Sequence, residues 1–407
     1  MKILQIAPEF PPNSLGGGGQ VIKALTEGLE AKGEKIVVVS ALFNVHGFFD
    51  RSIRTNLGKT TVVWLPLVPP PKVGFQLKSY LPPNIFSCFY LLKIFLRRDF
   101  DIVHIHGFSH FFCDFAAVLS RLSKKPYIYT LHGFPKEPDT RGGVLRFLYK
   151  LYVQLLAVPS VSKASRIIVV SESLAKESAP FFPNRKFEVI PNGINPSCKD
   201  RSNERKMREV KAKYELEGKI VILGLGRLCS IKGFQFAIRA LPEVLEKASN
   251  VVLVIAGADD GYGYSRELFR LVEENKVKPH VRFIGRITDE EEKNALLWST
   301  DVVVIPSTEE SFGLVAVEAM GAGRLIVASR VGGLAETLST DKYTWLTDGG
   351  NVKQLSGALI AAVTNLKLKP EAEAARNLRL AKFDMNTMAE SYHKLYASMS
   401  IEIAKSS

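Results

Sequence analysis

The stretch VVVIPSTEESFGLVAVEAMGAGRLIVAS, residues 302–329, predicts a strand, a helix and a second strand in direct succession. Its two ends are continuous apolar runs, as expected of strands that are buried on both faces of a sheet. A helical segment joins them, and a helix is the usual connection between two parallel strands. The stretch therefore predicts an α/β protein built on a parallel sheet.

The same alternation extends in both directions over the 407-residue chain. Helical patterns lie at 19–32, at 83–98 and at roughly 370–404. Further apolar runs predict strands at 2–7, 35–40, 61–65, 102–105, 127–131, 167–170, 187–190, 219–225, 251–257 and 281–284.

One segment interrupts this rhythm, VIPNGINPSCKDRSNERKMREVK at residues 189–211. Turn residues are followed there by a charged run, which is typical of a boundary between domains. We therefore predict two α/β domains, 1–195 and 196–384, whose Rossmann-like parallel sheets face a cleft. Paired domains of this kind commonly bind a ligand between them.

Composition and charge exclude several classes of protein. Apolar residues make up 46% and charged residues 23%, which excludes a mainly disordered, collagen-like or coiled-coil chain. The net charge is +13, and residues 1–195 carry +11 of it, with 24 Lys and Arg against 13 Asp and Glu. A basic domain can meet nucleic acid, an anionic membrane or a phosphorylated ligand. No RNP, helix-turn-helix or zinc-finger pattern is present, so we do not expect nucleic acid as a partner.

The cysteines and the apolar runs indicate in which cellular compartment the protein is expected. Four cysteines are scattered without a C-x-x-C pair, as free thiols of a reducing compartment would be. No apolar run reaches the ~18–20 residues of a membrane span. We expect a cytoplasmic protein, or one that binds peripherally to the inner face of the cell membrane. The apolar segment 85–96 fits either an interfacial helix or an ordinary crossover helix, and the basic apolar segment 144–157 supports the membrane interpretation.

Two glutamates stand out within the opening stretch. Glu310 directly precedes the helix, and Glu318 lies eight positions further on, inside it. The helical neighbours of Glu318 are apolar or small, so its carboxylate should be partly buried and needs a partner. Glu310 can also serve as a favourable charge at a helix N-terminus, and Glu318 can pair with an unidentified cation. Together the two glutamates favour a ligand with several hydroxyl groups.

Two glycine-containing loops follow predicted strands. The first, PEFPPNSLGGGGQ at residues 8–20, includes Gly17 and Gly18, and the second, GLGRLCSIKGF at residues 224–234, includes Arg227 and Lys232. Glycine lets a backbone approach a ligand closely, and two cations at the carboxyl end of a strand can clamp a diphosphate. The alternatives are a flexible turn and two solvated cations. Neither loop matches the dinucleotide fingerprint or the P-loop.

Histidines gather at the ends of predicted strands. His104, His106 and His110 lie in DIVHIHGFSH, residues 101–110, and His132 follows the strand 127–131. Spacing alone is weak evidence for a metal, so we predict polar residues at strand ends and no metal site. His132 projects toward the carboxyl edge of the sheet, where α/β folds bind ligands.

Together these motifs resemble the family 4 retaining glycosyltransferases of the GT-B fold, also called glycosyl transferases group 1. VVSES (169–173), VIPNGIN (189–195), GRLCSIKG (226–233) and the segment 283–323 match the family pattern in order. The spacing of Glu310 and Glu318 is the family signature. The resemblance implies a GT-B fold and a C-terminal helix, at about 385–407, that packs back on the first domain.

The resemblance also implies how the nucleotide part of a donor would be bound. Arg227 and Lys232 would bind the diphosphate of a nucleotide diphosphate sugar. Gly17 and Gly18 would approach the diphosphate from the first domain. Glu318 would hold the ribose hydroxyls.

The donor sugar would be held by the residues at the start of the same helix. Glu310 would act there together with the backbone of Phe312, Gly313 and Leu314. His132 would lie beside the anomeric centre, and with Glu310 it forms the implied catalytic pair. The family typically needs neither a metal nor another cofactor, since cations of the protein stabilise the leaving diphosphate.

The resemblance therefore implies a hexosyltransferase that retains anomeric configuration. It would move a sugar from UDP- or GDP-hexose to a glycan or lipid-linked acceptor, in cell-envelope or glycan biosynthesis. The positive charge of residues 1–195, the acceptor-side domain, favours an anionic membrane surface as a further partner. A GT-B relative with another reaction, such as a nucleotide-sugar epimerase or a sugar phosphorylase, remains the alternative.

Overall fold

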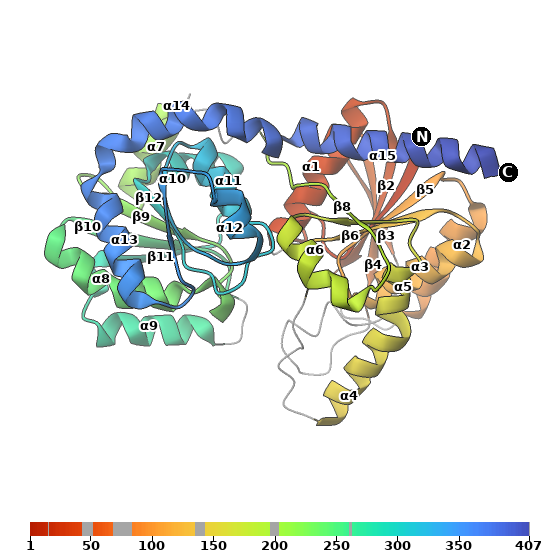
Figure 1. The fold of residues 1–407 in the computed structure, drawn as a ribbon, viewed down its shortest axis with the longest axis horizontal. Helices are drawn as coiled ribbons and strands as arrows, with labels where there is room; N and C mark the ends of the chain where they lie inside the picture. The colour runs from red at the N-terminus through yellow and green to blue at the C-terminus, as the bar shows by residue number, and fades with distance from the viewer. Residues whose placement is uncertain are drawn as a thin grey trace. The chain divides into compact units, whose positions relative to one another are not determined.

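The computed structural model describes residues 1–14, 16–42, 52–67, 84–134, 143–195, 203–259 and 263–406. The chain divides into two compact units (Figure 1). Unit 1 comprises Met1–Gly193 and Met385–Ser407, and unit 2 comprises Ile194–Asp384. In the described part of the chain, no helix is both long enough and apolar enough to cross a membrane. Residue 15 of the glycine loop and residues 196–202 of the predicted boundary lie outside the described residues.

Unit 1 alternates strands and helices from its first residues. Its elements are β1 (Lys2–Ala7), α1 (Gly17–Ala31), β2 (Lys35–Leu42), β3 (Ile53–Leu57), β4 (Thr60–Pro66), α2 (Ile85–Arg97), β5 (Ile102–His106), α3 (Phe111–Leu122), β6 (Tyr127–Leu131), α4 (Gly143–Tyr152), the π-helical turn η2 (Val153–Ala157), α5 (Val158–Ser162), β7 (Arg166–Val169), α6 (Glu172–Ser178), η3 (Ala179–Phe181), β8 (Phe187–Val189) and α15 (Met385–Ser406).

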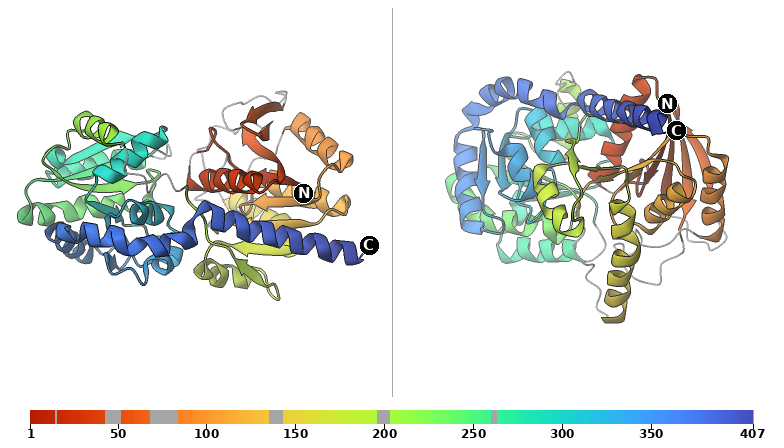
Figure 2. Two further views of the ribbon diagram at one scale, coloured as in Figure 1. Left: turned by 90° about the horizontal axis from the view of Figure 1, so that it is seen from above. Right: turned by 45° about the vertical axis from the view of Figure 1, so that its right-hand side comes forward.

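The described strands of unit 1 form one sheet in the order β3-β4-β2-β1-β5-β6-β7-β8. Every pairing is parallel except that of β3 with β4. The central strands β5 and β6 are buried along their whole length, which explains their continuous apolar runs. Helix α15 packs against α1, and a Cβ added at Gly28 would lie 2.6 Å from Cβ of Ala389, so the glycine permits this close contact (Figure 2).

Unit 2 repeats the architecture with a smaller sheet. Its elements are α7 (Glu204–Lys213), β9 (Ile220–Leu225), η5 (Ser230–Lys232), α8 (Phe234–Lys247), β10 (Val251–Ala256), α9 (Tyr264–Glu274), η6 (Lys278–His280), β11 (Val281–Gly285), α10 (Glu290–Ser299), β12 (Val302–Ile305), α11 (Leu314–Gly321), β13 (Leu325–Ser329), α12 (Gly332–Leu338), β14 (Thr344–Thr347), α13 (Val352–Thr364), η7 (Leu366–Leu368), α14 (Lys369–Leu380) and η8 (Ala381–Phe383).

The described strands of unit 2 are all parallel, in the order β11-β10-β9-β12-β13-β14. Apolar side chains of β9, β10, β12 and β13 pack on α8, α9 and α13 to form its core. The opening stretch of the sequence is β12, α11 and β13, which is the predicted strand–helix–strand unit.

Three elements differ from the sequence prediction. The edge strands β3 and β14 were not predicted, because one is mostly exposed and the other is short and polar at both ends. The single helical pattern at 370–404 is two helices, α14 and α15, separated by η8 and Asp384. The helix breaks where the chain passes from unit 2 back to unit 1.

Each sheet has a point where the order of the strands reverses. In unit 1 this point lies between β1 and β5, and in unit 2 it lies between β9 and β12. Parallel α/β sheets bind ligands beyond the carboxyl ends of the strands at such points. The loops that follow these four strands therefore define where a site is expected in each unit.

Candidate active site

The two loops at the reversal point of unit 2 carry the predicted cations and Glu310. Arg227 and Lys232 follow β9, and Glu310 follows β12. The Lys232 Nζ atom lies 2.6 Å from Oε2 of Glu310, and both side chains are about one-fifth exposed, at 21% and 18%. Within the part of the chain that the structure describes, the half-buried Arg227 side chain makes no ion pair. The structure therefore pairs Lys232 with Glu310, and Arg227 lies on the same loop as Lys232 without an ion pair among the described residues.

Close backbone contacts hold these loops together. The amide of Thr308 donates to the carbonyl oxygen of Ile231 at 2.8 Å, which joins the loop after β12 to the loop after β9. A Cβ added at Gly233 would lie 1.9 Å from the carbonyl oxygen of Pro306, so only glycine allows this approach. The first turn of α12, which follows β13, joins them through Gly333, whose amide donates to the carbonyl oxygen of Glu310 at 2.9 Å.

Glu318 has a partner that the sequence did not identify. Lys293 of α10 donates to Oε1 of Glu318 at 2.9 Å and also contacts Glu290 at 2.8 Å. Glu318 is 17% exposed and Lys293 is 20% exposed, so the predicted partial burial of Glu318 is correct. Burial alone would lower the pKa of Lys293, but the attraction of Glu318 and Glu290 outweighs it and raises the pKa above its ordinary value. Lys293 is the cation that the ion-pair interpretation of Glu318 required.

The residues predicted to hold a donor sugar form the start of α11. Gly313 is the N-cap, with φ of 92°, and Leu314 is the first helical residue. Phe312 is buried against Phe383, with ring centroids 5.6 Å apart. The first amides of a helix have no partner inside the helix, so this end of α11 offers donors to an oxygen-rich ligand.

The glycine loop of unit 1 differs slightly from the prediction. Helix α1 begins at Gly17, so Gly17 and Gly18 form its first turn rather than part of a loop. The N-cap Gly16 has no side chain to cap the helix, and the amides of the first turn are unpaired within the helix. A Cβ added at Gly18 would lie 3.0 Å from Oε1 of Glu9, which leaves little room for a larger residue.

His132 lies directly after β6 and is paired with His106 at the end of β5. Its Nε2 atom is 3.1 Å from Nδ1 of His106, and the planes of the two rings are tilted by 22°. Nδ1 of His132 and Nε2 of His106 are buried and have no hydrogen-bond partner in the described structure. Desolvation lowers the pKa of His132 to about 4 and that of His106 well below its ordinary value. Both imidazoles are therefore neutral at pH 7.

His104, which is buried like His106, is satisfied by the protein itself. Its Nδ1 atom lies 2.7 Å from the Tyr396 hydroxyl of α15, and its Nε2 atom lies 2.7 Å from Thr130 Oγ1 of β6. Thr130 Oγ1 in turn lies 3.0 Å from the Tyr392 hydroxyl. Within the described residues, no three His, Cys, Asp or Glu side chains are placed to hold a metal ion. His104 thus belongs to a buried network that ties α15 to the sheet.

A buried carboxyl group lies on α3, near the histidines in sequence. Asp114 accepts a hydrogen bond from the hydroxyl of Tyr129 at 3.0 Å and another from the hydroxyl of Tyr152. Burial raises its pKa to about 7, although the hydrogen bonds from its neighbours oppose this rise. Asp114 links the end of α4 to the core of unit 1.

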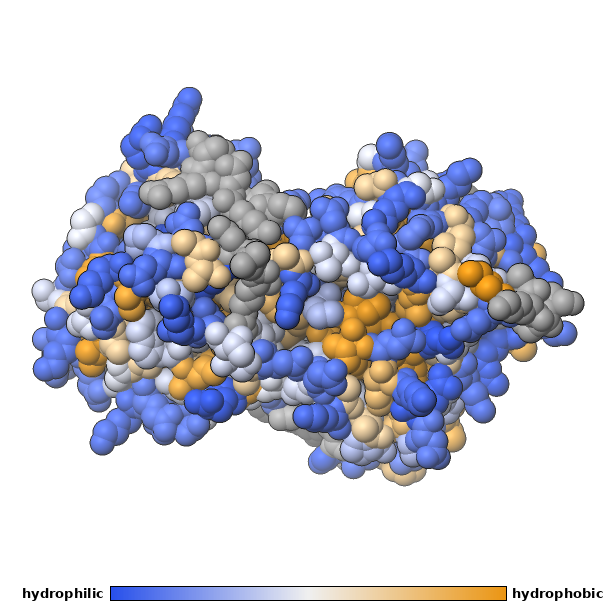
Figure 3. All heavy atoms as spheres, turned by 45° about the horizontal axis from the view of Figure 1, so that its top comes forward, coloured by the Kyte–Doolittle hydropathy of each residue, from blue (hydrophilic) through white to orange (hydrophobic). Residues whose placement is uncertain are grey.

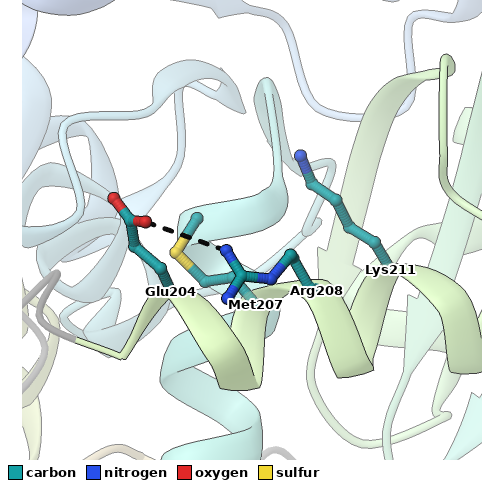
Figure 4. A pocket seen from close by; sticks show the side chains of 4 residues that line it. All are labelled: Glu204, Met207, Arg208 and Lys211. Atoms are coloured by element: carbon teal, nitrogen blue, oxygen red, sulfur yellow. Dashed lines mark ion pairs between the residues drawn. The ribbon is translucent and has the colours of Figure 1, made fainter.

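A shallow hollow on α7 is unrelated to these residues. Glu204, Met207, Arg208 and Lys211 line it, and the first and third form an ion pair of 3.9 Å (Figure 4). Glu204 and Arg208 are each 74% exposed, so this pair lies in solvent and contributes little. We assign no role to this hollow.

Two family models match the two halves of the chain. Residues 15–197 match Glycosyltransferase Family 4, and residues 206–378 match Glycosyl transferases group 1. An uncharacterized glycosyltransferase of Methanocaldococcus jannaschii is 31% identical over 354 residues, which is 83% of this chain and 83% of that protein. The phosphatidyl-myo-inositol mannosyltransferase of Mycobacterium leprae is 26% identical over 410 residues, which is 100% of this chain and 99% of that protein.

Solved structures share the fold over nearly the whole chain. Sucrose-phosphate synthase from Thermosynechococcus elongatus has a TM-score of 0.77 at 18% identity, covering 99% of this chain and 100% of that one. Anabaena HepE in complex with UDP-glucose has a TM-score of 0.74 at 20% identity, covering 98% of this chain and 100% of that one. The predicted GT-B fold is therefore confirmed. The chain is a glycosyltransferase and belongs to glycosyltransferase family 4.

Proposed function

We propose that the protein transfers a hexose from UDP- or GDP-hexose to a lipid-linked or glycan acceptor, with retention of anomeric configuration. The observation that carries this proposal is the Lys232–Glu310 ion pair of 2.6 Å at the reversal point of unit 2, with Arg227 uncompensated on the same loop as Lys232. A site of this kind has two cations and one carboxylate in reach of a single ligand. A nucleotide diphosphate sugar carries a diphosphate anion, which can bind the two cations, and hydroxyl groups, which can donate to the carboxylate. These contacts can replace the ion pair between Lys232 and Glu310.

The diphosphate would bind Lys232 and replace Glu310 as its ionic partner. Its charge would be shared by Lys232 and Arg227, and an arginine can grip phosphate oxygens with two parallel hydrogen bonds. Glu310, released from Lys232, would accept hydrogen bonds from sugar hydroxyls beside the free amides at the start of α11. These two cations supply the positive charge for the leaving diphosphate, so we propose that the reaction needs neither a metal nor a cofactor.

The ribose would be recognised by Glu318. The contact to Lys293 engages Oε1 of its carboxylate and orients the group. A carboxylate has acceptor capacity for several hydrogen bonds, so ribose hydroxyls can be added to the existing pair. Glu318 would therefore act as a preformed acceptor in the second unit.

Transfer with retention would proceed on one face of the sugar. The bond from the anomeric carbon to the phosphate oxygen breaks, the bond to the acceptor oxygen forms, and the departing phosphate takes the proton of the acceptor. In this scheme neither glutamate forms a covalent bond to the sugar, unlike the nucleophilic carboxylate of a retaining glycosidase. His132, being neutral, would contribute a hydrogen bond near the anomeric centre rather than a positive charge.

The choice of donor and acceptor is supported by the comparisons. HepE was solved with UDP-glucose, and the Mycobacterium leprae relative is named for transfer of mannose to phosphatidyl-myo-inositol. The first describes a UDP-hexose donor, and the second a lipid acceptor. The basic charge of residues 1–195 fits an acceptor at an anionic membrane, to which we propose that the enzyme binds peripherally.

A donor screen tests this proposal. The melting temperature is measured with UDP-glucose, GDP-mannose and related sugars, since a ligand that binds only the native state raises it. We expect one nucleotide sugar to stabilise the protein, and Arg227→Ala to abolish the shift. Exposed Lys247→Ala on α8 serves as the matched control.

Acceptor dependence separates transfer from the alternative reactions. With the stabilising donor, we expect nucleotide diphosphate to appear only when an acceptor is present, and the product to keep the donor's anomeric configuration by proton NMR. Conversion of the nucleotide sugar without any acceptor would support an epimerase instead. Release of a sugar phosphate would support a phosphorylase.

A further inference from the structure

Helix α2 carries an apolar stripe on its outer side. Ile85, Phe89, Leu92 and Leu96 follow one another at helical spacing and are 58%, 63%, 37% and 72% exposed. The inner side of the same helix is also apolar and is buried through Leu91 and Phe95. An ordinary crossover helix has a polar outer side, so the exposed stripe of α2 needs an explanation.

Helix α4 and the π-helical turn η2 carry a second stripe. Phe147, Leu148, Leu151 and Leu155 are 64%, 52%, 40% and 69% exposed. The opposite side of α4 faces the protein, where the Tyr149 hydroxyl lies 3.1 Å from Oγ of Ser109. The apolar side of α4 is therefore the side that points away from the core of unit 1.

Both stripes lie on the same face of the sheet of unit 1. The connections β4–α2–β5, β5–α3–β6 and β6–α4–α5–β7 all run in one direction across the sheet, whereas β1–α1–β2 runs in the other. Parallel crossovers are right-handed, so α2, α3 and α5 cover one face and α1 covers the other. Helix α3 contacts α2 on one side and η2 and α5 on the other (Figure 1). The two stripes thus flank α3.

The two segments that carry the stripes are basic, and the exposed Asp99 that directly follows the first segment is paired with Lys2. Residues 84–98 contain Lys93, Arg97 and Arg98 and no acidic residue, and residues 143–163 contain Arg146, Lys150 and Lys163 and no acidic residue. All six cations are exposed. Hydrophilic residues predominate on the face drawn in Figure 3, which also shows a patch of apolar residues just right of its centre.

We propose that the outer sides of α2 and of α4 with η2 form one docking surface for an anionic lipid membrane. This inference rests on the proposed function, because it names the surface through which the enzyme would reach a lipid-linked acceptor. The aromatic and aliphatic side chains enter the interface between headgroups and acyl chains, and the six cations bind the anionic headgroups. A protein partner would not require so uniform a sign of charge on two separate segments.

Flotation of the full chain with vesicles tests the surface. Vesicles of phosphatidylcholine alone are compared with vesicles that also contain phosphatidylglycerol, at low and at high salt. We expect binding only to the anionic vesicles, weakened by salt. The variants Phe89→Ser with Leu96→Ser and Phe147→Ser with Leu151→Ser should each reduce the bound fraction at least tenfold. Phe269→Ser, which removes a 50% exposed aromatic residue from α9 of unit 2, is the matched control.

Other results would contradict the proposed docking surface and leave the proposed donor site unaffected. Absence of binding to anionic vesicles, equal binding to neutral vesicles, or unchanged binding of both double variants contradicts the proposal. A dimer in light scattering that only these variants disrupt would assign the stripes to a second copy of the chain. In each case the donor-induced rise in melting temperature is measured on the same samples. A protein that binds the donor but not the vesicles contradicts only the docking surface, and a protein that does not bind the donor contradicts the proposed function.

Discussion

The polar groups of the candidate site differ in charge between the two units. In unit 2 the groups are charged and paired, Lys232 with Glu310 and Lys293 with Glu318. In unit 1 the corresponding groups, His106 and His132, are uncharged and share a single hydrogen bond. The same α/β architecture thus supports an ionic site and a neutral one.

The difference follows from solvent access. The ion pairs of unit 2 are about one-fifth exposed, so water and the partner together stabilise each charge. His106 is fully buried, and a charge there would lose hydration without gaining a counter-ion. The proposed function assigns the charged groups of unit 2 to a charged donor and the neutral histidines of unit 1 to hydrogen bonding.

The largest expected effect comes from removing one residue of the ion pair between Lys232 and Glu310. Lys232→Ala removes a cation from the diphosphate and leaves Glu310 without its partner, so kcat/KM should fall about 10²–10³-fold. Steady-state kinetics with the donor found in the screen measure this change. Lys247→Ala, a matched change on the exposed side of α8, should have no effect. Near-normal turnover of Lys232→Ala would remove this residue from the donor site.

The neutral pair in unit 1 is tested by a change at His106. His106→Phe removes the hydrogen bond that orients His132, so kcat should fall about tenfold to a hundredfold while the donor KM changes little. His106→Asn should restore most of the activity, because its amide can reproduce the bond made by Nδ1. If both variants lost activity and melting temperature equally, His106 would be a structural residue only.

A smaller effect is expected at the second ion pair. Lys293→Met removes the cation that orients Glu318, so the donor KM should rise roughly tenfold with little change in kcat. Glu318→Gln combined with Lys293→Met should cost less than the sum of the single changes, since the two residues act as one group. Additive effects would mean that Lys293 does not act through Glu318.

The smallest effect on turnover is expected from the buried groups that titrate in unit 1. Desolvation places the pKa of His132 at about 4, below its unfolded value of about 6.5, so the native state binds fewer protons and loses stability as pH falls between these values. Asp114 acts in the opposite direction. Its pKa of about 7 lies above the unfolded value of about 3.9, so it destabilises the protein as pH rises between them.

Thermal melts at several pH values measure this balance. Asp114→Asn removes the opposing contribution; one tyrosine hydroxyl can still donate to the asparagine oxygen, and the asparagine amide can donate to the other. We expect the melting temperature of this variant to fall more steeply than that of the original protein between pH 6.5 and pH 4, by a few degrees. Parallel curves for the two proteins would show that Asp114 is ionised in the folded state.

The resemblance to family 4 and the pattern of apolar runs were sufficient for the fold. Continuous apolar runs predicted the buried strands, and glycine spacing with the two glutamates located the loops around Arg227, Lys232 and Glu310. Edge strands such as β3 were missed because an exposed strand lacks the apolar run that burial imposes. Lys293 was missed for a different reason, since nothing in its local sequence indicates which helix it faces.

The sequence by itself determined that this protein alternates strands and helices, that it carries a signature pair of glutamates, and that its basic charge is concentrated in residues 1–195. These are local or additive properties, which short-range periodicity and composition record directly. Only the tertiary structure decided that Lys293 compensates Glu318, that His106 binds His132, and that apolar side chains of α2 and α4 remain exposed. Each of these depends on contacts, or on their absence, between segments far apart in the chain, and local pattern carries no information about them.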